Sequence, residues 1–262
     1  MKKAFLCMLV SLALVFGIGI HPGNALLMVS GDTNVIDALD GSQGIPIDAG
    51  NQRFFRNVLQ GGSSVVVLEN NRIGWDPVDS VNDFYNTISG VTSNIFDGMF
   101  TSDDLIGVDL FIAPLPNDSF TSAEISALGN YLTGGGSVFF LGENSNYVSQ
   151  NQSINDALAA LGSSLTLVPD MVAPTPPSPS VAVGSQIVSD PFTVGVSTFS
   201  HLTSSQVTGG TTLFYGNLDD ELLPFVAYEE NVGPAPVPEP ATVLLLSSGL
   251  VGLAGFRSKF KK

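Results

Sequence analysis

Three acidic residues have the chemistry of a catalytic or ligand-binding site. Asp32, Glu69 and Glu143 each follow a short apolar run that has the character of a buried strand. Ligands of open α/β sheets bind beyond the carboxyl ends of the strands, so we predict that these three acids face a ligand. A pair of carboxyl groups at that place would allow acid–base hydrolysis of a glycosidic bond. The alternative is that each acid only ends its strand in a solvated loop.

Other catalytic sets are incomplete. The only cysteine, Cys7, lies in the N-terminal leader, so the mature chain has no thiol nucleophile, disulfide or thiolate metal site. His201 is the only histidine beyond the leader, and Ser145 does not lie in a G-x-S-x-G motif. No glycine-rich phosphate-binding motif occurs. We therefore predict no catalytic residues, no metal site and no cofactor.

The charge of the central region excludes some classes of partner. All 24 acidic residues lie between Asp32 and Glu239, where the only basic residues are Arg53, Arg56 and Arg72, which leaves a net charge of −21. Such a surface repels nucleic acid and anionic membranes, so we predict no nucleic-acid partner. Calcium prefers carboxylate oxygens, so a calcium-stabilised module stays open, although the chain has no EF-hand loop.

The N-terminus has the three parts of a secretory signal peptide. Lys2 and Lys3 precede the apolar stretch 4–20, and the small residues Gly23 and Ala25 provide a cleavage site. We predict that residues 1–25 form a signal helix and that signal peptidase cuts after Ala25. A retained membrane helix is the alternative.

The C-terminus combines a short motif, an apolar segment and a basic cluster. Residues 231–240 form a linker that ends in Pro238, Glu239 and Pro240, residues 241–256 carry no charge, and residues 257–262 are basic. A helix over 241–256 would be about 24 Å long, slightly less than a hydrocarbon core of about 30 Å. We predict a transmembrane helix there that holds the protein in the inner membrane, with the basic tail in the cytoplasm.

This order of segments resembles the PEP-CTERM sorting signal. The resemblance rests on Pro238, Glu239 and Pro240, the apolar segment and the basic end, and covers about the last 26 residues. It implies an exosortase partner, a membrane cysteine protease-transpeptidase that cuts near the motif, in a Gram-negative-type bacterium. It also implies a secreted cell-surface or extracellular-matrix protein linked to exopolysaccharide and biofilm. A plain single-pass anchor is the alternative.

The middle of the chain alternates strand-like and helical patterns. The strand-like runs are 25–30, 64–68, 108–113, 137–141 and 165–168; the helical ones are 49–60, part of 78–96, the run capped by Ser122, and 154–161. This alternation predicts one α/β domain over 26–230, doubly wound around a mostly parallel sheet. A proline-rich loop over 169–180 interrupts it, and a β-rich C-terminal part, with runs such as 192–196 and 211–215, completes it.

The middle domain also resembles the class I glutamine amidotransferase-like, flavodoxin-like superfamily. The resemblance rests on the runs 109–116, 121–131, 134–142 and 188–196. Catalytic members place a cysteine after the strand that corresponds to 137–141, where this chain has Gly142 and Glu143. The resemblance therefore implies a non-catalytic version of the fold.

These patterns predict an exported, non-enzymatic protein that binds or presents an extracellular component, with exopolysaccharide as a candidate partner. Two alternatives stay open. One is a polysaccharide-acting hydrolase that uses Glu143 with Asp32 or Glu69, and the other is the calcium-stabilised structural module.

Overall fold

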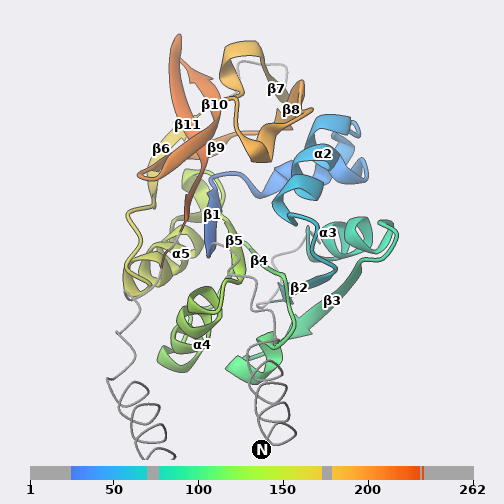
Figure 1. Cartoon of the computed structure of the whole chain (residues 1–262). Coiled ribbons are helices and arrows are strands. Elements are labelled where there is room, and N and C mark those ends of the chain that lie inside the picture. The colour runs from blue at the N-terminus through green and yellow to red at the C-terminus, as the bar shows by residue number, and fades with distance from the viewer. Residues whose placement is uncertain (1–24, 70–76, 173–178, 231, 233–262) are drawn as a thin grey trace, which may run out of the picture.

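A seven-stranded sheet of order β10-β11-β1-β5-β4-β2-β3 forms the centre of the molecule (Figure 1). The computed structural model describes residues 25–69, 77–172, 179–230 and 232. The predicted signal helix before Ala25, the sorting motif, the transmembrane helix and the basic tail lie outside these residues. Within the described ranges, no helix has the length and apolar character needed to cross a membrane.

Five strands of this sheet are parallel to one another. They are β1 (Leu26–Ser30), β2 (Ser64–Glu69), β3 (Thr92–Asp97), β4 (Leu110–Pro114) and β5 (Ser137–Leu141). β1, β4 and β5 are buried along their whole length, which is typical of parallel strands covered on both faces. The predicted α/β class with a mostly parallel sheet is confirmed.

The C-terminal strands extend the same sheet in the antiparallel sense. β11 (Glu221–Glu230) pairs with β1, and β10 (Thr211–Leu218) pairs with β11. The register places Leu26 opposite Glu230, so both ends of the domain lie at the amino edge of the parallel strands. Two small antiparallel sheets accompany them: β6 (Thr166–Val172) with β9 (Ser204–Thr208), and β7 (Ser180–Val183) with β8 (Thr198–His201).

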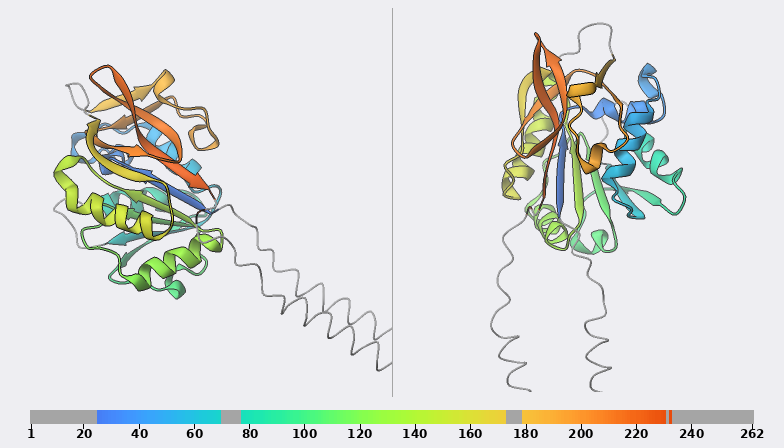
Figure 2. Two further views of the ribbon diagram at one scale, coloured as in Figure 1. Left: turned by 90° about the vertical axis from the view of Figure 1, so that its left-hand side faces the viewer. Right: turned by 45° about the horizontal axis from the view of Figure 1, so that its top comes forward.

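Helices cover both faces of the sheet, as the right-hand view of Figure 2 shows. α2 (Ala49–Val58) and α3 (Pro77–Asn86) pack on one face, with Leu26 and Met28 of β1. α4 (Ser122–Thr133) and α5 (Val148–Ala160) pack on the other, with Leu27 and Val29. Successive strand side chains point to opposite faces, so β1 contributes to both cores.

Phe54 of α2 joins the β-rich part to the parallel sheet. Its ring makes edge-to-face contacts with Phe139 of β5, Phe199 of β8 and Phe214 of β10, at centroid distances of 6.1, 5.2 and 5.1 Å. Such pairs contribute about 0.5–1.5 kcal/mol each beyond the area that they bury. The C-terminal strands therefore share one core with the parallel sheet.

Several predicted boundaries are wrong. α4 is capped by Thr121 and not by Ser122, because Glu124 at the third helical position completes a capping box with Thr121. The prediction that part of 78–96 is helical is confirmed by α3, which ends at Asn86, but β3, which follows a turn at Gly90 with a φ of +83°, was not predicted. α5 begins at Val148, six residues before the predicted start at Ile154.

Two further differences lie in the C-terminal part. The predicted strand 192–196 is wrong, because none of these residues lies in a strand. Pro191–Thr193 form a 3-10 turn, which Asp190 caps by accepting from the Phe192 N–H at 2.9 Å, and the next strand begins at Thr198. β6 reaches Val172, so the predicted loop over 169–180 starts later than expected. Of that loop, residues 173–178 lie outside the described residues.

Candidate functional site

The structure brings together two of the three predicted acids. Asp32 follows β1 and Glu143 follows β5, and these strands are direct neighbours in the sheet. Glu69 ends β2, which lies two positions from β5, or about 10 Å at the usual strand spacing. Asp32 and Glu143 therefore form one cluster at the carboxyl edge of the sheet, and Glu69 lies apart from it.

A single amide group holds both carboxyl groups. The Nδ2 of Asn34 donates to Oδ1 of Asp32 at 3.0 Å and to Oε2 of Glu143 at 2.7 Å. Oδ2 of Asp32 accepts from the Leu202 N–H at 2.6 Å, and Oε1 of Glu143 accepts from the Asn144 N–H and Nδ2 at 3.0 and 2.8 Å. Each of the four carboxyl oxygens thus accepts a hydrogen bond from the protein itself.

Burial controls the protonation of this cluster. Asp32 and Glu143 are 0% and 1% exposed. Desolvation raises the pKa of Asp32 from 3.8 to about 6, against the hydrogen bonds that lower it. Desolvation and then the charge of Asp32 raise the pKa of Glu143 well above its ordinary value. Desolvation also raises the pKa of nearby Asp37 to about 6. The cluster therefore retains protons at pH values where exposed carboxyl groups have lost theirs.

The backbone around Glu143 is closed by α5 and β9. Asn151 accepts from the Glu143 N–H at 2.9 Å and donates to the Glu143 carbonyl oxygen at 2.6 Å. The Ser205 hydroxyl donates to the same carbonyl oxygen at 2.7 Å. A Cβ added to Gly31 would lie 1.9 Å from the Ser205 carbonyl oxygen, so β9 passes directly over the end of β1. The acid pair is enclosed by the fold.

The remaining candidates for chemistry are placed in packing roles. The ring of His201 packs on Phe225 at 4.5 Å between centroids, its Nδ1 lies 2.8 Å from the Leu202 carbonyl oxygen, and burial lowers its pKa. Ser145 begins a short 3-10 turn after β5. Within the described ranges, no group of three or more His, Cys, Asp or Glu side chains is arranged to hold a metal ion.

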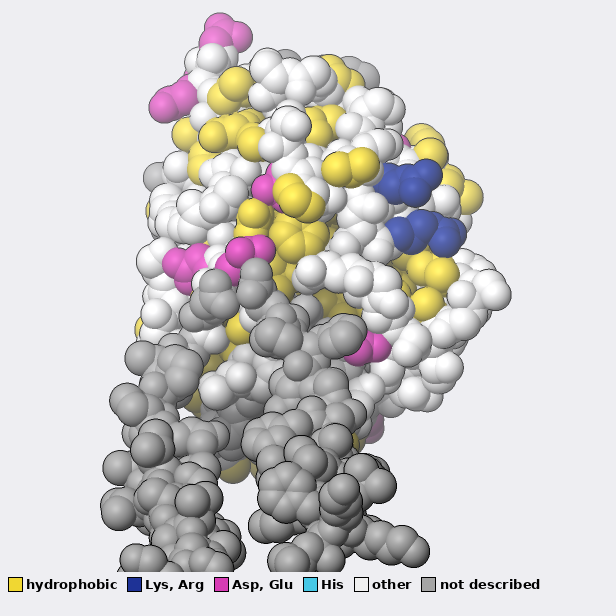
Figure 3. Space-filling model, viewed as in Figure 1, with side chains coloured by type: hydrophobic (Ala, Val, Ile, Leu, Met, Phe, Trp, Pro, Cys, Tyr) yellow, Lys and Arg dark blue, Asp and Glu magenta, His cyan; other side chains and the backbone are white. Residues whose placement is uncertain are grey.

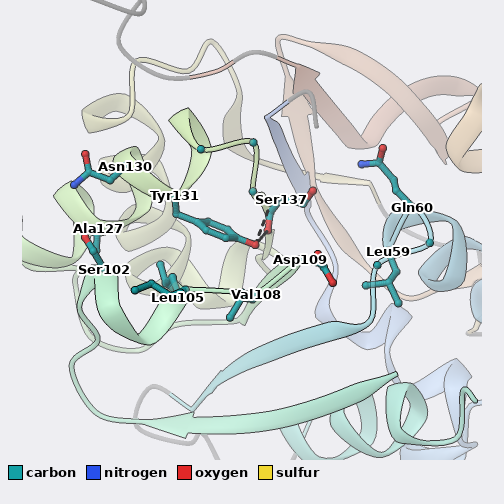
Figure 4. Close-up of a pocket in the computed structure, with 17 residues that line it drawn as sticks. Leu59, Gln60, Ser102, Leu105, Val108, Asp109, Ala127, Asn130, Tyr131 and Ser137 are labelled. Atoms are coloured by element: carbon teal, nitrogen blue, oxygen red, sulfur yellow. Dashed lines mark hydrogen bonds between the residues drawn. The ribbon is translucent and has the colours of Figure 1, made fainter. Parts of the chain in front are cut away.

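A cavity of about 680 Å³ lies at the opposite, amino edge of the sheet (Figure 4). The segments that enter β2, β4 and β5 form its walls together with α4. Tyr131 of α4 points across it, and its hydroxyl lies 3.3 Å from both the N–H and the carbonyl oxygen of Ser137 (Figure 4). Asp109 stands at the start of β4, where its Oδ2 accepts from the N–H groups of Ser63 and Ser64 at 2.6 and 3.0 Å.

Two glycines allow side chains that line this cavity to pack closely against the backbone. A Cβ added to Gly136 would lie 2.3 Å from the Tyr131 ring, and one added to Gly62 would lie 2.6 Å from the Cβ of Asp109. The tyrosine ring and the aspartate therefore lie directly against glycine backbone. The cavity was not predicted from the sequence. The signal available was a glycine cluster before two strands.

Ala25, the predicted cleavage residue, lies immediately before β1. The N–H of Leu26 donates to the Gly136 carbonyl oxygen at 3.3 Å. Cleavage after Ala25 would leave the whole of β1 in the mature chain. The predicted sorting residues Pro238, Glu239 and Pro240 lie outside the described residues.

Comparison with known proteins identifies the tail. Residues 236–259 match the family model described as the PEP-CTERM protein-sorting motif, which indicates a protein sorted by exosortase to the cell surface. No curated protein matches the chain. A solved structure titled "mmIFT52 N-terminal domain" is similar at 18% identity and a TM-score of 0.49, over 62% of this chain and 77% of that chain. The resemblance of the middle domain to the glutamine amidotransferase-like superfamily stays a prediction.

Proposed function

We propose that the chain is a non-enzymatic binding protein of the cell surface or extracellular matrix. In this proposal signal peptidase removes the leader, the segment 241–256 holds the protein in the inner membrane during transit, and exosortase then processes the tail in a Gram-negative-type cell. The α/β domain binds exopolysaccharide and contributes to a biofilm. The sorting motif at residues 236–259 supports the destination.

The proposed binding role rests on a difference between the two edges of the sheet. At the carboxyl edge, the hydrogen-bonding capacity of Asp32 and Glu143 is used by internal donors. At the amino edge, an open cavity presents glycine backbone, the Tyr131 ring and the side chains of Gln60 and Asn130. Ligand sites combine a concave surface and an aromatic or apolar wall with a few polar groups, and such a wall with amide groups suits a sugar.

A hydrolase is the second candidate, and one observation favours it. Asp32 and Glu143 share a donor and both have a raised pKa, as a catalytic acid requires. A catalytic carboxyl group must also come within about 2.6–3.2 Å of the atom that it protonates. If the Glu143→Gln variant cleaves every tested exopolysaccharide as the wild type does, this candidate is removed.

The calcium-stabilised module has its own test. A melting temperature that does not change in millimolar calcium would count against it.

Sorting is tested by the intact mass of the protein recovered from native cell fractions, with and without exosortase. We expect a mature chain that starts at Leu26 and ends near Pro238–Pro240 only when exosortase is present. A mass that still includes residues 241–262 in both strains would reduce the tail to a membrane anchor.

Binding is tested with the mature protein purified from the same cells and the exopolysaccharide of those cells. Ser102 is exposed and lines the cavity, so Ser102→Trp should fill it and abolish binding. Ser89→Trp is the matched control, because Ser89 is exposed in the turn after α3 and does not line the cavity. Equal binding by both variants would contradict the proposed site.

A further inference from the structure

Two arginines of α2 form an isolated basic patch. Arg53 and Arg56 are the only lysine or arginine residues in the part of the chain that the structure describes, and Figure 3 shows them as two neighbouring dark-blue groups. Both are exposed, and their spacing of three places them on one face of the helix. The central region has a net charge of −21. If its few basic residues were distributed at random, two of them would not be expected side by side.

Within the described residues, the patch does not pair with acids of the domain. Neither arginine forms an ion pair with any residue in the described ranges. The Arg56 guanidinium lies over the Phe84 ring, 5.4 Å from its centroid, and the Arg53 side chain runs beside Gly195. Two like charges at this spacing destabilise a helix by about 0.2–0.5 kcal/mol, which offsets part of what Arg56 gains from the Phe84 ring and from its place in the last turn of α2.

A hollow of about 480 Å³ adjoins the patch. Arg56 lines it together with Asn57, Phe192, Tyr228 and Glu230, and it shares Gln60 and Gly61 with the larger cavity at the amino edge. Its walls are held in place. The Nδ2 of Asn57 donates to the carbonyl oxygens of Phe192 and Val194, both at 2.9 Å. The ring of Phe192 packs edge-to-face on Tyr228 at 4.9 Å.

We infer that Arg53, Arg56 and this hollow bind an acidic sugar of an extracellular polysaccharide, with a carboxylate on the guanidinium groups and the sugar ring in the hollow. This inference rests on the proposed binding function. Guanidinium groups pair with carboxylates through two parallel hydrogen bonds. Glu230 can accept from a sugar hydroxyl at the other side of the hollow.

The charge of the domain favours a sugar over an acidic peptide. Glu230 lines the same hollow as Arg56, and Asp190 lies beside it, since its Oδ2 accepts from the Tyr228 hydroxyl at 2.9 Å. A peptide with a carboxylate on each residue would be repelled by these acids. A polysaccharide spaces its carboxylates by whole sugar rings, and screening over about 8 Å at physiological salt limits the repulsion from the rest of the domain.

The test measures binding of oligogalacturonate and of a neutral galactan oligomer to the full mature protein by calorimetry. In the variant with Arg53→Gln and Arg56→Gln, we expect oligogalacturonate affinity to fall about tenfold or more, because charge-assisted hydrogen bonds are lost. The control variant carries Gln152→Glu and Ala159→Glu, two exposed positions of α5 on the opposite face of the sheet. It lowers the net charge by the same amount and should bind as the wild type does.

Four results would overturn the inference. They are equal binding by the arginine variant, an equal loss in the α5 control, stronger binding of the neutral oligomer, and equal binding of a polyglutamate peptide. If the wild type binds native exopolysaccharide but no oligogalacturonate, the acidic-sugar inference fails and the proposed function stands. If it binds neither, both fail.

Discussion

The buried acid pair should make the protein less stable as pH rises. A carboxyl group whose folded-state pKa is raised contributes stability below its unfolded pKa, and that contribution is lost as pH rises through the folded pKa. For Asp32 the window runs from about 4 to about 6, because burial raises its pKa from 3.8 to about 6. Asp37 acts in the same direction, since burial also raises its pKa to about 6.

The magnitude follows from the shift of Asp32 alone. A rise from 3.8 to about 6 is about two units. At about 1.36 kcal/mol for each unit, the free energy of unfolding should fall by about 3 kcal/mol across the whole window. About 1.4 kcal/mol of this fall lies between about pH 5 and about pH 7.5, which corresponds to about 3–6 °C in Tm for a domain of this size.

Urea unfolding of the mature protein at those two pH values measures this change. Asp32→Asn removes the titrating group and should flatten the dependence. It also lowers stability at every pH, because its single amide oxygen cannot accept from both Leu202 and Asn34 as the two oxygens of Asp32 do. Asp83→Asn, at an exposed position of α3, is the control and should keep the wild-type slope. A free energy of unfolding that is constant or rises toward pH 7.5 would refute the reasoning.

Three further predictions concern the packing of strands and helices. Gly31→Ala should lower the free energy of unfolding by about 3 kcal/mol, because the new Cβ would collide with the Ser205 carbonyl oxygen. Gly129→Ala in α4 should raise the free energy of unfolding by about 0.5–1 kcal/mol, because alanine favours a helix over glycine and the new methyl group makes only an ordinary contact at 3.8 Å. Asn51→Ala should cost about 3 kcal/mol, because the buried Ser200 N–H and carbonyl oxygen lose the Asn51 amide. Urea titrations of the three variants check these values, and a Gly31→Ala protein as stable as Gly129→Ala would contradict the first two.

The sequence predicted the elements whose patterns are strong. Four of the five parallel strands are recognisable because apolar runs such as 64–68 and 137–141 must be buried on both faces. β3 was missed, because it lies at the edge of the sheet and its residues Thr92, Asn94 and Asp97 are exposed. An edge strand needs no apolar run, so composition alone does not reveal it.

The candidate site depended more on tertiary structure than the elements did. The prediction that acids follow strands identified Asp32 and Glu143, but strand order decided that these two meet and that Glu69 does not. Their enclosure comes from Asn34, from Leu202 and from the passage of β9 over Gly31. Predicting the amino-edge cavity would likewise have required knowing which glycines face Tyr131 and Asp109.

The destination of the protein is determined by sequence alone, because a sorting motif over residues 236–259 is a linear signal that needs no partner from elsewhere in the chain. The net charge of the central region, from which we predict no nucleic-acid partner, is likewise a property of composition. The chemistry of the domain was decided only by the tertiary structure. The tertiary contacts between residues far apart in the chain bury the acids, let two carboxyl groups share one amide and leave a cavity open. No local sequence pattern predicts such contacts.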